Sequence, residues 1–178
     1  MSTLPLDQTA VIFGRRSIRV YSPGRITQPQ IKQMLEAAMA APSAMSKDPW
    51  RFIVIEETET LANLPKLLPG GAMLSTAAAA ILVCGDQEAA FDRNVSYMLQ
   101  DCAAAIENLL ICAHGLGLGG CWVGVHPDEK AIQGLKLLFE LPTPVVPIAV
   151  VSLGVPGEDP GPRTRYHAGF VHREKWGT

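Results

Sequence analysis

The spacing of apolar residues along this 178-residue chain separates candidate helices from candidate strands. After Thr27, apolar residues recur at every third or fourth position as far as Ala38, which is typical of one helix face, and Pro42 ends the run. Thr27 and Gln30 form a capping-box pattern, which marks the start of that helix. In contrast, Ala77–Cys84 is apolar at every position, which indicates a buried central strand.

The other elements follow from the same criteria. The sequence predicts further helices at Leu6–Gly14, Thr58–Leu68, Phe91–His114 and from Pro127–Asp128 to just before Pro142. It predicts further strands at Trp50–Glu56, Cys121–Val125 and Val145–Leu153. Because helices and strands do not alternate regularly, we expect an α+β fold rather than a doubly wound sheet.

The longest predicted helix, Phe91–His114, is apolar almost all round, and its polar residues gather near one narrow stripe. A helix of this kind is buried on most sides. It is either a central core helix or a core helix that also forms a subunit interface. We expect Gly115 to end it as a left-handed cap. The tail, residues 154–178, is too polar to be core, yet Trp176 indicates that it packs onto something.

Composition predicts one domain over residues 1–178. The chain is 48% hydrophobic and only 18% charged, which excludes disorder and predicts extra burial against a partner, a cofactor or both. The net charge of −2 gives no basic footprint for nucleic acid. No apolar run reaches the roughly 20 residues that span a membrane, and Met1–Gly14 lacks a signal-peptide pattern. We therefore expect a cytoplasmic protein.

Short patterns that would suggest dinucleotide or metal binding do not fit their surroundings in this sequence. Gly115, Gly117 and Gly120 match the GxGxxG dinucleotide fingerprint, but here they follow a helix and precede a strand, the reverse of a Rossmann loop. They would instead permit close backbone approach to a flat ligand or another segment. His167 and His172 lack a third metal ligand. The cysteines show no zinc spacing, and we expect buried reduced thiols at Cys84, Cys102, Cys112 and Cys121.

Residues 15–19, Arg-Arg-Ser-Ile-Arg, carry the most informative chemistry. In an extended segment, the first arginine, the serine and the last arginine point to the same side. Two guanidinium groups around a hydroxyl would bind phosphate well, because arginine recognises oxyanions bidentately. Alternatively, the segment is a solvated basic turn that stabilises the end of the first helix. Arg163 and Arg165 either close on the same phosphate or solubilise the tail.

Taken in order, these segments resemble the nitroreductase family of FMN-dependent oxidoreductases. The resemblance covers almost the whole chain. Its pieces are Arg-Arg-Ser-Ile-Arg at 15–19, Ala-Pro-Ser-Ala at 41–44, Pro-Trp-Arg-Phe at 49–52, Gly-Leu-Gly-Leu-Gly-Gly-Cys-Trp at 115–122, Leu-Pro at 141–142, and Arg165, His172 and Trp176. It implies a mainly antiparallel central sheet flanked by helices, in an intertwined homodimer with FMN in each of two interface sites.

The resemblance also implies site residues. By resemblance, Arg15 and Ser17 would bind the FMN phosphate, and Arg19 would lie near the pyrimidine edge of the flavin, where its charge would stabilise the anionic reduced ring. Gly119 and Gly120 would offer backbone contacts near the reactive edge. The full implied set is Arg15, Arg16, Ser17, Arg19, Gly119, Gly120, Arg163 and Arg165, with Pro42, Ser43, Ala44 and Ser46 from the other subunit.

The implied mechanism is ping-pong. NADH or NADPH gives a hydride to the flavin and leaves, and an electron-poor acceptor such as a nitroaromatic or a quinone takes its place. Two residues depart from the family pattern: Ser46 where Asn is frequent and Asp48 where Gln is frequent. Asp48 either lowers the potential of a nearby ring, or faces solvent or pairs with Lys47 or Arg51 without effect. These departures leave open a flavin-binding protein with a sensing or storage role.

Overall fold

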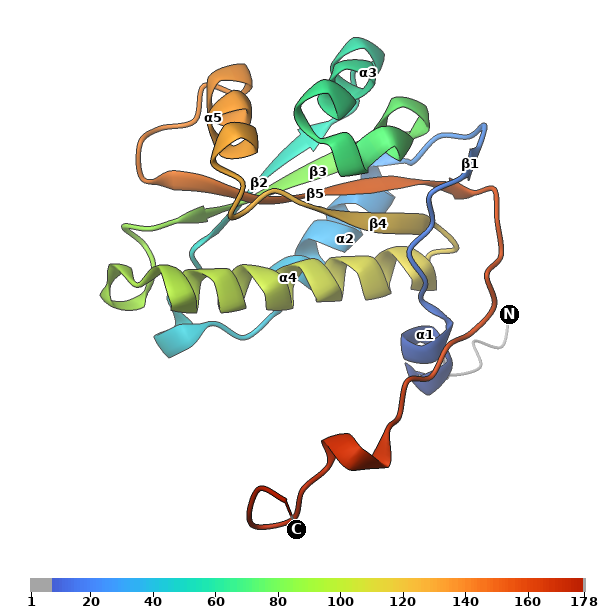
Figure 1. The fold of residues 1–178 in the computed structure, drawn as a ribbon. Helices are drawn as coiled ribbons and strands as arrows, with labels where there is room; N and C mark the ends of the chain where they lie inside the picture. Colours follow the sequence, from blue (N-terminus) through green and yellow to red (C-terminus); the bar gives the residue numbers. More distant parts are fainter. Residues whose placement is uncertain (1–7, 178) are drawn as a thin grey trace.

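The computed structural model describes residues 8–177, which form a five-stranded sheet with helices on both faces (Figure 1). Its α-helices are α1 (Gln8–Gly14), α2 (Gln28–Met39), α3 (Thr58–Leu67), α4 (Val95–Gly115) and α5 (Glu129–Leu138). Its strands are β1 (Tyr21–Ser22), β2 (Trp50–Ile55), β3 (Ala79–Asp86), β4 (Gly119–Gly124) and β5 (Val145–Pro156). Short 3-10 helices are η1 (Ala44–Ser46), η2 (Pro69–Thr76), η3 (Phe91–Arg93) and η4 (Ala168–Phe170).

The sheet is built around β5, and all of its strand pairs are antiparallel. β5 pairs with β3 along one edge and with β4 along the other, β2 extends the sheet beyond β3, and β1 pairs with the last residues of β5. β3 is buried at every position except its last, as its uninterrupted apolar run predicted. The predicted α+β fold with a mainly antiparallel sheet is confirmed.

Two helical layers enclose this sheet (Figure 1). Ile81 and Val83 of β3 belong to the core shared with α2 and α4, whereas Ala80 and Leu82 belong to the core shared with α3 and α5. This division follows from the two-residue alternation of side chains along a strand. The predicted capping box is present at the start of α2, where Thr27 and Gln30 each accept the backbone N–H of the other.

Helix α4 begins four residues later than the sequence pattern predicted. Phe91 belongs to η3, and the following Asp92 and Arg93 adopt positive φ angles of 53° and 52°. Asn94 then caps α4, because its side chain accepts the backbone N–H groups of the first turn. The apolar periodicity therefore extended the prediction across a chain reversal that only local hydrogen bonds reveal.

The end of α4 also differs from the prediction. Gly115 is still helical, and the left-handed residue is Gly117, with a φ of 75°. The N–H of Gly117 bonds to the carbonyl of His114, and the N–H of Leu118 bonds to that of Ala113. This is a Schellman cap, in which a glycine relieves the strain of the left-handed turn. Among residues 8–177, no helix is both long and apolar enough to span a membrane.

The polar residues of α4 lie in two rows rather than one stripe. Asp101 accepts the backbone N–H of Ala44 at 2.9 Å, and Asn108 donates to the carbonyl of Ala37 at 3.1 Å, so this row faces the body of the chain. Glu107 belongs to the other row and pairs with the segment after α1. The single-stripe prediction is therefore wrong.

The remaining boundaries shift by a few residues. β4 starts two residues before the predicted strand, and β5 runs three residues past its predicted end. α1 ends at Gly14 as predicted, and the first two residues of the predicted helix lie outside the described range. The thiols of Cys84, Cys102 and Cys121 are free and buried as predicted, whereas Cys112 is only partly buried.

Candidate functional site

The basic segment after α1 is extended and lies against the start of β4. Ser17 forms a parallel bridge with Gly120, and the N–H of Ile18 donates to the Gly120 carbonyl at 3.0 Å. Gly119 packs under the same segment, since an added Cβ would lie 2.8 Å from the Cβ of Ile18. The two glycines therefore allow the basic segment to lie directly on the strand.

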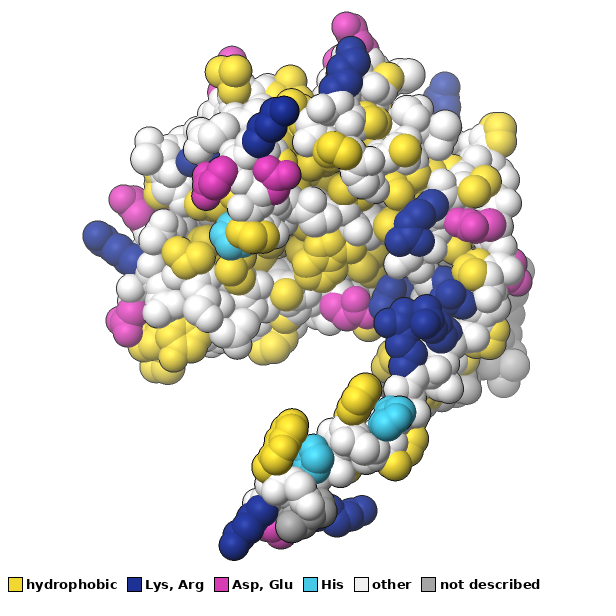
Figure 2. All heavy atoms as spheres, in the orientation of Figure 1, with side chains coloured by type: hydrophobic (Ala, Val, Ile, Leu, Met, Phe, Trp, Pro, Cys, Tyr) yellow, Lys and Arg dark blue, Asp and Glu magenta, His cyan; other side chains and the backbone are white. Residues whose placement is uncertain are grey.

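Arginines from both ends of the chain meet beside this segment. A pocket of about 360 Å³ is lined by Arg15, Arg16, Ser17, Arg163 and Arg165, together with Thr164 and two apolar residues of α1. Figure 2 shows the dark blue side chains gathered where the C-terminal arm leaves the body. Guanidinium groups and hydroxyls in this arrangement suit an anion of more than one negative charge, such as a phosphate monoester.

Two acidic residues fix the geometry of this cluster. Glu107 of α4 holds Arg15, with 2.9 Å between Oε1 and the arginine Nε. Glu158, just after β5, accepts the backbone N–H groups of Arg19 and Val20 at 2.6 and 3.1 Å. These two bonds lower the pKa of Glu158. Sequence reasoning missed both carboxylates, because nothing in their local patterns marks them.

Arg16 holds the arm rather than pointing freely into the pocket. Its Nη1 donates to the carbonyls of Pro160 and Gly161 at 2.9 and 2.5 Å. The N–H of Arg163 in turn donates to the Phe13 carbonyl at 3.2 Å. These bonds bring the arm alongside residues 13–20, which explains how the predicted arginines of both segments converge.

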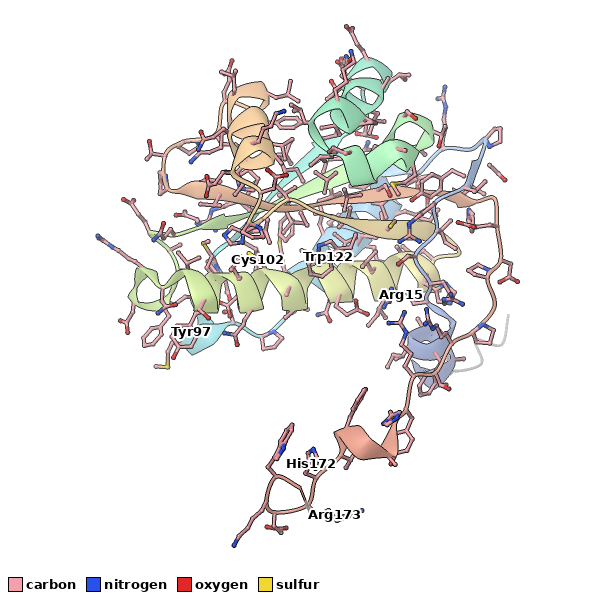
Figure 3. All side chains as sticks on the ribbon, in the orientation of Figure 1. Arg15, Tyr97, Cys102, Trp122, His172 and Arg173 are labelled. Carbon is pink, nitrogen blue, oxygen red and sulfur yellow. The ribbon has the colours of Figure 1, made fainter. Side chains whose placement is uncertain are left out.

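The outer edge of β4 is open beyond this contact. The Gly120 carbonyl faces outward to Ile18, so the two-residue alternation turns the backbone N–H and C=O of Trp122 and Gly124 to the same edge. No described segment pairs with that part of the edge. In the view of Figure 3, Trp122 lies between β4 and α4, and Arg15 lies nearer α1. A planar heterocycle with donors and acceptors on its rim could pair there.

Trp122 and Gly124 are candidate site residues that the sequence analysis missed. The signal was present, because both follow Gly120 at intervals of two along a predicted strand. A second hollow, of about 580 Å³, shares Arg15 and Arg16 with the first and includes Gly120 in its lining. Arg19 lines neither of these two hollows, although its backbone is held by Glu158.

The predicted residues Pro42, Ser43, Ala44 and Ser46 lie elsewhere. Their loop, cyan in Figure 1, sits near the N-terminal end of α4, whereas α1 lies near its C-terminal end. The 21 residues of α4 make it about 30 Å long. One chain therefore does not bring this loop to the arginine pocket.

The loop has an unusual backbone. Met45, Ser46 and Asp48 all adopt positive φ angles, of 52°, 52° and 49°. The Ser43 hydroxyl donates to Asp48 Oδ1 at 2.5 Å and accepts the Asp48 N–H at 3.0 Å. Within residues 8–177, the Asp48 carboxylate forms no ion pair with Lys47 or Arg51; Arg51 donates instead to the Asp48 carbonyl at 3.2 Å.

Comparison with known proteins places these features in context. Residues 12–90 and 68–155 match the model of the Nitroreductase family. The chain is 40% identical, over 96% of its length and 88% of the other, to a Methanothermobacter thermautotrophicus protein named as an NADH dehydrogenase/NAD(P)H nitroreductase. A crystal structure named as an NADH oxidase from Clostridium acetobutylicum is 38% identical, with a TM-score of 0.87 over 93% of this chain and 99% of that one. A nitroreductase from Desulfovibrio desulfuricans in complex with FMN is 28% identical, with a TM-score of 0.83 over 97% and 99%.

Proposed function

This chain belongs to the nitroreductase family, as its motifs predicted, and we propose how it acts as an oxidoreductase that uses FMN and NAD(P)H. It passes a hydride to an electron-poor small molecule, such as a nitroaromatic or a quinone. The proposal includes a ping-pong order, in which the reductant leaves before the acceptor binds. FMN, when bound, supplies the hydride chemistry. The chain's own residues would bind and orient the cofactor.

The arginine pocket beside an open strand edge carries this proposal. A phosphate monoester fits the donors of Arg15, Ser17, Arg163 and Arg165, and the rim of a flat ring fits the unpaired backbone groups of β4. Arg19 would add a fixed positive charge on the same segment, which favours negative charge on a reduced ring. Neither feature requires a side-chain nucleophile.

We also propose that the working unit is a homodimer. The C-terminal arm extends away from the body (Figure 1), with Tyr166 and Phe170 each 81% exposed and Trp176 89% exposed. Within the arm, His167 stacks on Phe170, and the ring of His172 lies against that of Trp176 in a tilted arrangement. Aromatic residues this exposed are typical of an interface.

A two-fold axis would complete the site. If α4 packs antiparallel to its partner's α4, the loop near the N-terminal end of one helix lies beside the arginine pocket at the far end of the other. Pro42, Ser43, Ala44 and Ser46 would then reach the cofactor bound by the second chain, as the family resemblance implied. The arm, residues 157–177, would pack on the dimer, whereas the first three residues of the predicted tail belong to β5.

The purified protein tests these points directly. We expect a yellow protein that releases FMN on denaturation, has the mass of two chains by light scattering, and is bleached by NADH or NADPH without oxygen. A colourless protein that cannot be reconstituted would overturn the proposal. Bound flavin that neither nicotinamide bleaches would instead support the sensing or storage alternative. Parallel lines in double-reciprocal plots at several acceptor concentrations would support the ping-pong order.

A further inference from the structure

Asp101 has no part in the site described so far, yet its environment is costly. It lies within α4 with only 6% of its surface exposed, between fully buried apolar neighbours such as Cys102 and Ala105. Its Oδ1 accepts the N–H of Ala44, and its Oδ2 has no hydrogen-bond partner among the described residues. Burying a carboxylate with one oxygen unpaired destabilises a protein, so such a group requires an explanation.

The contact that Asp101 makes supplies that explanation. Ala44 is the first residue of η1, and Ser43 before it provides no side-chain cap because its hydroxyl bonds to Asp48. Asp101 therefore takes the place of the missing cap, with a carboxylate from a different helix on the first N–H. The loop needs this support, since Met45 and Ser46 directly after it hold left-handed conformations that non-glycine residues avoid.

We propose that Asp101 is a positioning residue for the cofactor site of the partner subunit. By fixing the Ala44 N–H to a rigid core helix, Asp101 holds residues 42–46 in the shape in which they meet the FMN bound by the other chain. This inference rests on the proposed function, because it requires the site to be shared between two chains. It adds a residue that touches neither cofactor nor partner.

The charge of Asp101 is not what the geometry requires. An asparagine keeps the Oδ1 acceptor for the Ala44 N–H. Its neutral amide nitrogen replaces the unpaired Oδ2, which removes the buried charge. Asp101→Asn should therefore bind FMN with nearly the wild-type Kd, whereas Asp101→Ala should raise the Kd about tenfold or more. Asn108→Ala is the matched control, because it removes an α4 hydrogen bond to a backbone atom outside the loop.

The same hydrogen bond can be removed from the loop side. Ser43 is extended, with φ −136° and ψ 157°, which suits a residue before proline, and Ala44 opens a helical turn, which suits proline itself. Ala44→Pro removes the donor without altering the core helix, and we expect it to weaken FMN binding as Asp101→Ala does. If both act through one bond, the double variant binds no more weakly than either single variant. Additive losses would overturn the proposal.

Mixed dimers test the partner assignment. One chain carries Arg15→Ala and the other Asp101→Ala, with different affinity tags, and FMN is titrated by fluorescence quenching. If Asp101 acts on the partner's site, one of the two sites combines the unchanged Arg15 of one chain with the unchanged loop of the other. Each mixed dimer then binds one FMN with wild-type affinity. If Asp101 acts on its own chain's site, both sites are defective and no tight binding appears. That second result would overturn the proposal.

Failure of the proposed function is distinguishable from failure of this inference. A wild-type protein without FMN affinity, or an Arg15→Ala homodimer with normal affinity, would contradict the cofactor assignment itself. A wild-type protein that binds FMN, beside an Asp101→Ala homodimer that binds it equally well, would contradict only the role of Asp101. Circular dichroism and thermal melting of each variant show that the compared proteins are folded.

Discussion

Arg15→Ala should weaken FMN binding by roughly 10- to 150-fold. Glu107 forms an ion pair on the Nε side of the guanidinium, without a hydrogen bond to Nε among the described residues, so the two terminal nitrogens remain for a phosphate. The Arg15 side chain is only 26% exposed. A hydrogen bond to a charged group contributes about 1.5–3 kcal/mol, which converts to that range of Kd. The assay is quenching of FMN fluorescence by the apoprotein at one fixed ionic strength, because salt screens exposed charges.

Two further variants separate the role of Arg15 from a general charge effect. Arg25→Ala removes the same charge from an exposed arginine outside the cluster, and we expect its Kd to stay near the wild-type value. Arg15→Ala also leaves the Glu107 carboxylate unpaired beside the anion, so adding Glu107→Gln should recover part of the lost affinity. If Arg15→Ala and Arg25→Ala bind FMN equally well, Arg15 does not hold the phosphate.

Three other predictions follow from the same geometry. Gly119→Ala should lower the free energy of unfolding by about 1–3 kcal/mol in thermal melts, because its Cβ would overlap Ile18. In Gly124→Ala the added Cβ meets open space, so this variant should keep the wild-type Tm while slowing hydride transfer. Burial raises the pKa of the buried cysteine thiols, two of them to about 12, so at pH 8 they should resist a thiol reagent while Cys112 reacts first, as mass spectrometry would show. The pKa of Glu158 is lowered from 4.5, so its bonds should persist at neutral pH and fail only as the pH falls below 4.5. Loss of these bonds should release bound FMN below that pH, as the fluorescence of free FMN would show, and Glu158→Gln should abolish this release.

The fold could be predicted because its elements follow local periodicity. The apolar run at Ala77–Cys84 predicted a buried strand, and Thr27 with Gln30 predicted a helix start. Each prediction needed only residues close together in the sequence. The start of α4 was missed although Asn94 is a favoured cap, because the apolar pattern continues to Phe91. The left-handed Asp92 and Arg93 leave no mark in the sequence.

The two polar rows of α4 could have been separated in advance. Gln100 and Glu107 are seven residues apart, as are Asp101 and Asn108, so each pair lies on one line along the helix, with about 100° between the lines. The sequence does not show which line faces the body, since that depends on how α2 and the loop before β2 pack. Glu158 was out of reach for the same reason: its partners are backbone N–H groups 138 and 139 residues away.

One helix thereby serves two proposed cofactor sites. Glu107 holds Arg15 of its own chain's site, and Asp101, six residues or about 9 Å earlier along α4, holds the loop that would reach the partner's site. Because α4 is buried and continuous between them, a displacement of the helix would move both contacts together. In the proposed dimer, a rigid α4 would position polar groups for two subunits at once, and the apolar sides of the helix hold it in the core.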